Sequence, residues 1–240
     1  MQRLHICFNA LTALLLACSP LWSATVSGSI DVQTGSKEAH DRRDRSNDIV
    51  IWLEPVHGIS ALPVQSQHAQ LVQKNKMFHP HVLPITVGTS VDFPNEDPIF
   101  HNAFSNYDGQ PFDVALYPPG TSRTVRFRQA GIVRVFCNIH PSMSAVIVVL
   151  NTPYFTKGSE GQYQIRNVPP GDYKLNFFDE RATRDPLSPT VISVGQEETQ
   201  VTGPVIHISE AGYLQLPHKN KYGLDYPPGA DAQGYGGPPQ

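Results

Sequence analysis

The stretch IVRVFCNIHPSMSAVIVV, residues 132 to 149, decides the fold that this sequence predicts. Two runs rich in Val and Ile enclose a short loop that contains a proline, which is the pattern of two β-strands joined by a tight connection. The loop carries Cys137, His140 and Met143 in the spacing C-x2-H-x2-M. The run from Ala145 to Leu150 is entirely apolar, so we expect a buried strand there.

The composition of the whole chain also favours strands and turns. Of the 240 residues, 22 are Pro and 18 are Gly, so few long windows lack a helix-breaking residue. Hydrophobic residues make up 40% of the chain, which excludes a disordered acidic protein. The 18 Lys and Arg residues against 21 Asp and Glu residues give a net charge of −3, which argues against a nucleic-acid binder. We therefore expect an all-β protein.

Residues 1–23 have the features of a secretory signal peptide. A positively charged start precedes an apolar stretch around Leu11 to Ala17, and small residues follow it. The segment Leu15 to Cys18 also fits a lipobox, so the alternative is a lipoprotein tethered through Cys18. We favour simple cleavage and release into the periplasm, because the first β-like run starts at Thr25. No other segment reaches the ~18 apolar residues of a transmembrane helix.

Cleavage near residue 23 leaves Cys137 as the sole thiol, and three cysteines are too few for a disulfide scaffold. One interpretation is an inert cysteine buried in the core. The other is a metal ligand, because His101 upstream completes a set of one thiolate, two imidazoles and one thioether. This donor set is typical of a type 1 copper site. Zinc is disfavoured, since methionine is not a usual zinc ligand.

Residues 65–150 resemble a cupredoxin, the Greek-key β-sandwich of the blue copper proteins. The resemblance rests on the loop CNIHPSM, whose short spacing is similar to that of amicyanin rather than plastocyanin. It rests also on the run FHPHVLPITVGTSVDFPNEDPIFHNAFS, residues 78 to 105. Similar chains are commonly labelled methylamine utilization or plastocyanin-like proteins. The stretch from residue 104 to 123 shows no strand pattern that matches amicyanin.

The resemblance also implies individual roles around one copper ion. The implied ligands, three equatorial and one axial, are His101, Cys137, His140 and Met143. Two more residues support them, Asn102 through a hydrogen bond to the ligand loop and Pro141 by stiffening that loop. In the family the C-terminal histidine ligand lies nearest the surface, which makes His140 the expected electron port.

A second β-sandwich is expected from the flanking sequence. The stretch YFTKGSEGQYQIRNVPPGDYKLNFF, residues 154 to 178, resembles the transthyretin-like, carboxypeptidase regulatory-like module, which has a carbohydrate-binding-like fold. VSGSIDV and DIVIWLEP near the N-terminus resemble its first two strands. We therefore expect residues 25–64 with 151–209 to form one discontinuous domain into which the cupredoxin is inserted. The alternative is two domains in series.

Residues 210–240, rich in Pro and Gly, are expected to form a disordered tail.

Two further groups of residues give weaker functional signals. His79 and His81 allow a second copper contact, but ordinary strand-end histidines are the preferred interpretation. A set of arginines allows a docking patch for an acidic partner, although their alternation with apolar residues favours a solvated strand face. These are Arg123, Arg126, Arg128 and Arg134.

The expected function is single-electron transfer by a periplasmic type 1 copper protein that is not itself an enzyme. The resemblance implies a redox partner such as a c-type cytochrome or a periplasmic dehydrogenase. Two alternatives stay open. One is copper binding and delivery without redox turnover, which needs the same ligands. The other is carbohydrate binding or adhesion by a secreted protein in which the cupredoxin fold is merely structural.

Overall fold

The computed structural model describes residues 22–33, 48–58, 62, 68–106, 109–183, 190–214 and 217–231. The expectation of an all-β protein is confirmed, because the described residues form strands joined by turns and contain no α-helix. None of these residues belongs to a helix long and apolar enough to cross a membrane. The predicted signal peptide lies outside the described residues, apart from its last two positions.

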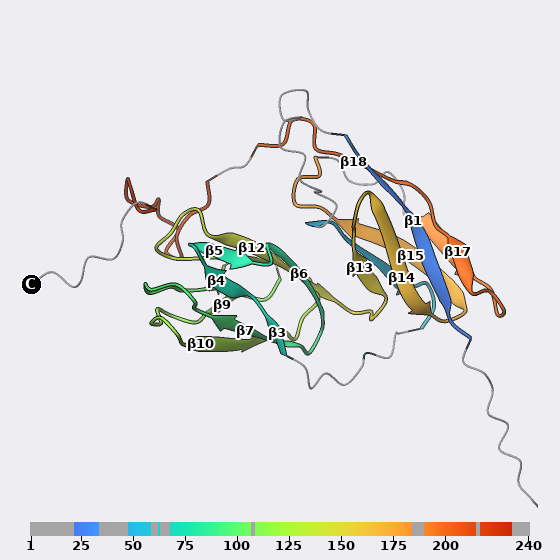
Figure 1. Cartoon of the computed structure of the whole chain (residues 1–240), viewed down its shortest axis with the longest axis horizontal. Helices are drawn as coiled ribbons and strands as arrows, with labels where there is room; N and C mark the ends of the chain where they lie inside the picture. The colour runs from blue at the N-terminus through green and yellow to red at the C-terminus, as the bar shows by residue number, and fades with distance from the viewer. Residues whose placement is uncertain are drawn as a thin grey trace, which may run out of the picture.

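Two lobes lie end to end in Figure 1, and the first is built from ten consecutive strands. These are β3 (His68–Gln70), β4 (Val72–Lys74), β5 (Met77–His79), β6 (Val82–Thr86), β7 (Ser90–Pro94), β8 (Phe104–Ser105), β9 (Phe112–Asp113), β10 (Ser122–Arg126), β11 (Gly131–Phe136) and β12 (Ser144–Leu150). One sheet has the order β6-β12-β11-β8-β9, another has the order β10-β7-β3, and β4 pairs with β5. Alternate side chains such as Val91 and Phe93 of β7 and Val133 and Val135 of β11 fill the core of this lobe.

The second lobe combines strands from both ends of the chain. They are β1 (Ala24–Gln33), β2 (Val50–Pro55), β13 (Phe155–Lys157), β14 (Gln162–Val168), β15 (Gly171–Phe178), β16 (Thr190–Val194), β17 (Gln200–Thr202) and β18 (Ile206–Ser209). β1 pairs antiparallel with β14 and parallel with β17 and β18, while β2 lies between β13 and β15 in the other sheet. The discontinuous-domain hypothesis requires such pairing, although the domain boundaries themselves stay a prediction.

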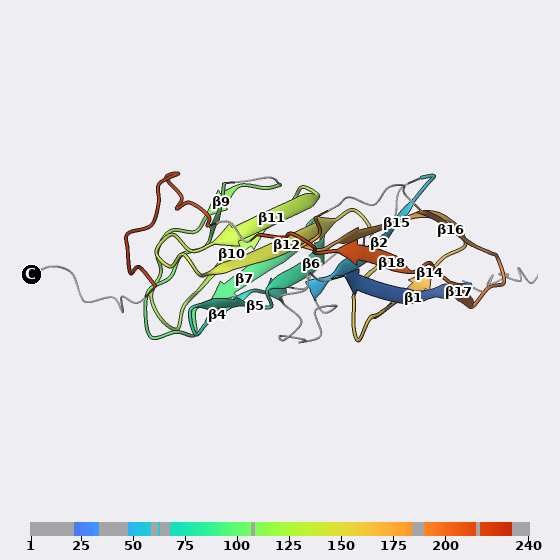
Figure 2. The same cartoon turned by 90° about the horizontal axis from the view of Figure 1, so that it is seen from above.

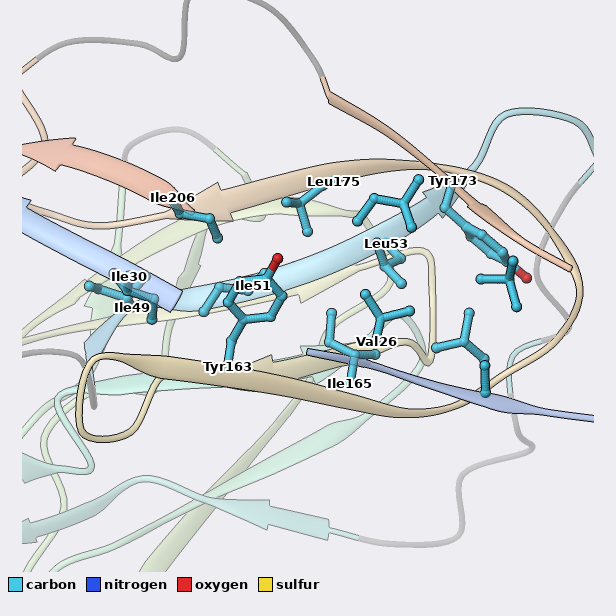
Figure 3. Close-up of a cluster of buried hydrophobic side chains, with 14 of the residues drawn as sticks. Val26, Ile30, Ile49, Ile51, Leu53, Tyr163, Ile165, Tyr173, Leu175 and Ile206 are labelled. Carbon is cyan, nitrogen blue, oxygen red and sulfur yellow. The ribbon is translucent and has the colours of Figure 1, made fainter. Parts of the chain in front are cut away.

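The core of the second lobe lies between these two sheets (Figure 3). Tyr163 and Ile165 of β14 point into it and are at most 2% exposed, as the alternating pattern predicts. The Tyr163 ring packs so closely on Gly28 that a Cβ atom built there would lie 2.5 Å from the phenol oxygen. A side chain at Gly28 would therefore displace the ring.

Strand β12 lies where the two lobes meet, and it is buried on both faces. Ala145, Ile147 and Val149 pack in the first-lobe core, while Val146 and Val148 pack against the second lobe, where Val50 and Phe178 contribute. This double burial explains why the strand has no polar alternation. Polar contacts surround the junction: Glu180 accepts hydrogen bonds from His81 at 2.6 Å and from Arg134 at 2.8 Å.

The prediction of a disordered tail over residues 210–240 is wrong for residues 217–231. This segment, which we call the C-terminal strap, leaves the second lobe and returns to the far end of the first (Figures 1 and 2). Its side chains hydrogen-bond to that lobe, as Tyr226 and His218 show. Composition misled here because the strap is held by a few specific polar and aromatic contacts rather than by an apolar core of its own. Residues 215–216 and 232–240 lie outside the described part of the chain.

Candidate metal centre

The sequence-predicted ligand loop closes the turn between β11 and β12. These strands pair antiparallel up to Phe136 and Ser144, so Cys137 and Met143 lie at the two ends of the loop. The Cys137 N–H donates to the Met143 carbonyl at 3.2 Å, and the Met143 N–H donates to the His140 carbonyl at 3.1 Å. These bonds bend the loop back on itself, which turns the side chains of Cys137 and His140 toward the same point.

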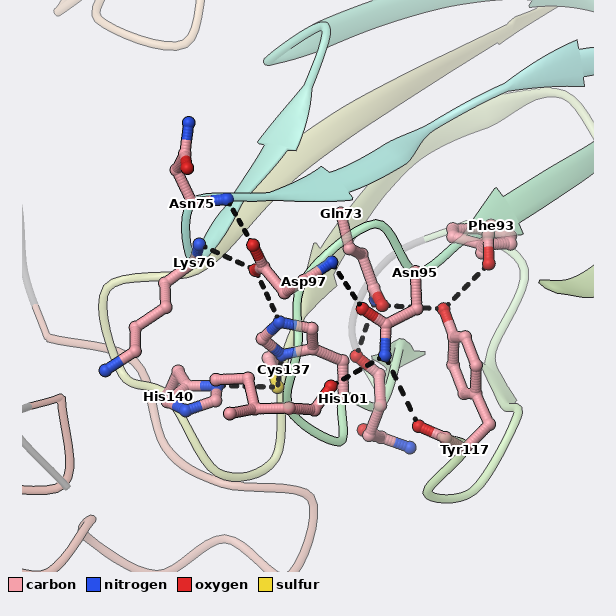
Figure 4. A network of polar contacts seen from close by, with 12 residues as sticks. Gln73, Asn75, Lys76, Phe93, Asn95, Asp97, His101, Tyr117, Cys137 and His140 are labelled. Carbon is pink, nitrogen blue, oxygen red and sulfur yellow. Dashed lines mark hydrogen bonds and ion pairs between the residues drawn. The ribbon is translucent and has the colours of Figure 1, made fainter. Parts of the chain in front are cut away.

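His101 reaches the loop from the segment before β8. Its backbone exchanges two hydrogen bonds with Tyr117, at 3.2 and 2.9 Å, so its position is fixed by an antiparallel bridge. The Nδ1 atoms of His101 and His140 lie 3.9 and 3.7 Å from the Cys137 Sγ atom (Figure 4). The two rings are 4.9 Å apart between centroids, in an edge-to-face arrangement.

This spacing fits one metal ion held between the three side chains. A nitrogen and a thiolate bound at about 2.0 and 2.3 Å lie about 3.7 Å apart when the angle at the metal is about 120°. The observed separations of 3.9 and 3.7 Å between the Cys137 sulfur and the two Nδ1 atoms are close to that value. One nitrogen or sulfur atom from each of His101, Cys137 and His140 lies within 4.8 Å of the others, a grouping found once among the described residues.

Burial keeps the donors neutral in the metal-free protein. His101, Cys137 and Met143 have no exposed surface and His140 has 1%. Burial lowers the pKa of His140 to about 4, helped by the neighbouring His101. Burial also raises the pKa of the Cys137 thiol, against the backbone N–H groups of Ile139, Asn102 and His140 that point at its sulfur. Those N–H groups favour the thiolate once a cation is present.

Asp97 is a member of the site that sequence reasoning missed. Its Oδ2 atom accepts a hydrogen bond from His101 Nε2 at 2.7 Å. Its carboxylate also accepts the backbone N–H groups of Asn75 and Lys76, at 2.6 and 2.9 Å. Burial opposes the charge, but these bonds together hold the pKa of Asp97 below its usual value. The proton on His101 therefore stays on Nε2, and its Nδ1 lone pair faces Cys137.

An unusual turn delivers the two N–H groups to Asp97. Asn75 and Lys76, which connect β4 to β5, both have φ near +54°. This left-handed conformation is common for Asn and rare for Lys, and it points two successive amides at one acceptor. The spacing D-x3-H from Asp97 to His101 was the available sequence signal.

Asn102 and Pro141, the two residues predicted to support the ligands, both form hydrogen bonds that involve the ligand loop or the residues around it. The side-chain oxygen of Asn102 accepts the Asn138 N–H at 3.3 Å, and its amide nitrogen donates to Asp113 at 2.7 Å. The Pro141 carbonyl accepts a hydrogen bond from His218 Nε2 at 2.7 Å. Asn102 thus ties the segment of one candidate ligand to the loop that carries the other three.

Other residues singled out in the sequence lie outside the centre. His81 donates to Glu180 at the lobe junction, and its pKa is raised mainly by that bond. His79 is exposed on β5 and joins no metal-binding group in the described residues. Among the arginines, Arg134 pairs with Glu180, and Arg126 donates to the Gly88 carbonyl. Their contacts are those of a partly solvated strand surface.

Comparison with known proteins gives solved structures of copper proteins. No family model matches the chain, and no curated protein matches it. The copper-containing nitrite reductase from Thermus scotoductus SA-01 is 29% identical, with a TM-score of 0.35 over 40% of this chain. This chain spans 25% of the length of that reductase chain.

Two smaller proteins are covered almost completely. A purple cupredoxin from Nitrosopumilus maritimus is 24% identical over 34% of this chain and 99% of its own, with a TM-score of 0.31. Amicyanin from Paracoccus versutus is 18% identical over 42% of this chain and 97% of its own, with a TM-score of 0.33. At these scores the likeness carries no functional conclusion for this chain.

Proposed function

We propose that this chain is a type 1 copper protein that passes single electrons between redox partners. The observation that carries the proposal is the convergence of two imidazole Nδ1 atoms on the Cys137 sulfur, at 3.9 and 3.7 Å, inside the protein. Copper bound there supplies a Cu(I)/Cu(II) couple, the one-electron chemistry that thiolate and imidazole donors support.

The proposed ligands are His101, Cys137, His140 and Met143. The first three are supported by their mutual distances. Met143 is supported by its full burial in the first-lobe core and by the hydrogen bonds that place it beside Cys137 and His140. A thioether there is a weak ligand that tunes the potential rather than holding the ion.

The surroundings of the donors favour electron transfer over the other functions. Asp97 fixes the ring of His101, and Asn102 fixes the loop, so the donors need little rearrangement when the charge at the site changes. Catalysis on a bound substrate is disfavoured because the most accessible candidate ligand, His140, is only 1% exposed. The same burial disfavours rapid delivery of copper to another protein.

The test is copper titration of the metal-free protein with visible and EPR spectroscopy. We expect one equivalent of Cu(II) to produce an intense thiolate-to-copper band, and Cys137→Ser to abolish it while leaving the strands intact by circular dichroism. Because Cys137 is buried among apolar residues, Cys137→Ala serves as a second variant that adds no polar group. A copper-loaded protein that stays colourless contradicts the proposal.

We further propose that the first lobe is an insertion, so that residues 25–64 and 151–209 form one domain around residues 65–150. The pairing of β1 with β14 and of β2 with β15 supports this division. A chain in which a short Gly/Ser linker replaces residues 65–150 is then expected to keep its β-sheet circular dichroism spectrum. Loss of all folded structure in that chain contradicts the insertion.

Location and partner are proposed from the sequence. Residues 1–23 direct the chain to the periplasm, where a c-type cytochrome or a dehydrogenase exchanges electrons with it. Cell fractionation with mass spectrometry of the mature N-terminus tests the cleavage, and a lipid-modified Cys18 is the outcome that contradicts it. Stopped-flow mixing with a reduced c-type cytochrome tests the exchange.

A further inference from the structure

We infer that the C-terminal strap, residues 217–231, is part of the metal centre: Tyr226 and His218 are positioning residues that hold the ligand loop and close it to solvent. The inference rests on the proposed function only for what the site binds. The strap itself is held by contacts within the protein, and Figure 2 shows its path at the end of the first lobe.

The strap contacts the ligand loop at its main chain. The Tyr226 hydroxyl donates to the carbonyl of Cys137 at 2.7 Å. His218 Nε2 donates to the carbonyl of Pro141 at 2.7 Å, and its ring stacks on Phe136 with 4.0 Å between centroids. The two strap residues also contact each other, because the Tyr226 hydroxyl lies 3.3 Å from His218 Nδ1. One aromatic pair thus fixes the loop on both sides of His140.

Charged and polar contacts anchor the two sides of this pair. Asp231 accepts hydrogen bonds from the N–H and the hydroxyl of Ser142, at 3.2 and 2.9 Å. Its own carbonyl accepts from Lys76, in the turn that holds Asp97, at 2.7 Å. On the other side, the Lys221 N–H donates to the Asn138 side chain at 3.0 Å.

These contacts explain why His140 is buried. The loop forms the end of the first lobe, and the strap covers that end (Figure 1). Residues 137–142 are bound by the strap at Cys137, Asn138, Pro141 and Ser142. His140, which lies among them, is left with 1% exposure. His140 is still the most exposed of the four candidate ligands, as expected for an electron port, but it presents almost no surface of its own.

Two consequences follow for the centre. A loop held at its carbonyls opens less often, so reagents reach the Cys137 sulfur and the metal more slowly. The strap also adds a layer between His140 and any partner, so electrons cross the strap or its aromatic pair rather than leaving from a bare imidazole edge.

The experiment compares the full chain with strap variants, all carrying Cys7→Ser and Cys18→Ser so that Cys137 is the sole thiol. Tyr226→Phe removes the hydroxyl that reaches Cys137 and keeps the ring. Its matched control is Tyr222→Phe, in the same strap, where the side chain is 70% exposed and contacts Lys221 of the strap itself. A chain ending at Leu214 removes the strap altogether.

The first measurement needs no copper: the rate at which 5,5′-dithiobis(2-nitrobenzoate) modifies Cys137 in the metal-free protein. Loss of one hydrogen bond is expected to raise this rate about fivefold in Tyr226→Phe. Removal of the strap is expected to raise it at least about tenfold, and Tyr222→Phe to leave it unchanged. Equal rates in the full chain and in the chain ending at Leu214 overturn the inference.

The second measurement separates positioning from general stability. In copper-loaded protein we expect Tyr226→Phe and His218→Ala to speed copper transfer to a chelator and to shift the thiolate band, with His218→Gln, which retains a donor, closer to the original. The temperature of unfolding should change little. Faster modification only in variants that also unfold at lower temperature contradicts a positioning role. If the full chain stays colourless after copper is added while the rate of Cys137 modification still depends on the strap, the copper function is rejected and the positioning role of the strap is retained.

Discussion

The Nε2 atom of His101 lies 2.7 Å from the Oδ2 atom of Asp97, and the exposed fractions of the two side chains are 0% and 8%. A buried carboxylate that accepts a hydrogen bond from one nitrogen of an imidazole makes the other nitrogen a stronger electron-pair donor to a metal. The same carboxylate is held by two backbone amides of the β4–β5 turn. The first lobe thus sets the electronic character of the candidate ligand as well as its position.

Asp97→Asn is expected to weaken copper binding by about 10- to 100-fold and to raise the reduction potential. The amide neither carries the charge nor strengthens His101, so Cu(II) loses more stabilisation than Cu(I). A tenfold difference between the two losses raises the potential by about 59 mV. Protein-film voltammetry measures the potential. The control is Glu96→Gln, whose exposed carboxylate pairs with Lys74, and an equal shift in this control refutes the role of Asp97.

Glu180→Gln is expected to loosen the junction between the lobes. Glu180 binds both His81 and Arg134, and the pKa of His81 is raised mainly by this contact. Because the folded pKa of His81 lies above its unfolded value of about 6.5, its contribution is complete below that pH and is lost as the pH rises through the folded pKa. We expect a loss of about 1 kcal/mol in the free energy of unfolding at pH 6, shrinking toward pH 9.

Denaturant unfolding at both pH values measures this loss. Glu197→Gln, which changes an exposed turn carboxylate of the second lobe, is the control. A loss that stays constant from pH 6 to 9 shows that Glu180 stabilises the fold through Arg134 and not through His81.

Local patterns in the sequence predict the parts of the centre that belong to one strand or one loop. The two strands, their tight connection and the positions of Cys137 and His140 follow from consecutive residues of the β11–loop–β12 unit. The structure has the antiparallel strand pair and brings these two side chains together with His101. Burial of β12 on both faces is likewise visible as an uninterrupted apolar run.

Contacts between distant segments could not be predicted in this way. Asp97 works through amides at residues 75 and 76, whose left-handed conformation depends on how β4 and β5 meet. The strap binds through single hydrogen bonds to carbonyls, which any sequence possesses and no pattern marks. Its Pro and Gly content indicates a segment that forms no hydrophobic core of its own. Composition does not indicate that the segment binds to the end of the first lobe.

Met143→Leu is expected to keep copper bound and to raise the reduction potential. Leu fills nearly the same volume in the core, so the free energy of unfolding of the metal-free protein should fall by less than about 1.5 kcal/mol. Removal of a weak thioether ligand leaves the thiolate and the two imidazoles, which hold the ion. The EPR hyperfine splitting and the potential report the change, and spectra identical to those of the original protein show that Met143 is not a ligand.

Acidification is expected to destabilise the metal-free protein through His140. Its folded pKa of about 4 lies below the unfolded value of about 6.5, so the folded state binds fewer protons between these pH values. The contribution of His140 to the free energy of unfolding is therefore fully present above about pH 6.5. As the pH approaches 4, the free energy of unfolding falls by about 3 kcal/mol. His140→Gln, which does not titrate, should lose less over the same range in denaturant unfolding. Copper competes with the proton for Nδ1, so the loss moves to lower pH in the loaded protein. Equal pH dependence in the original protein and in His140→Gln contradicts the assignment of this loss to His140.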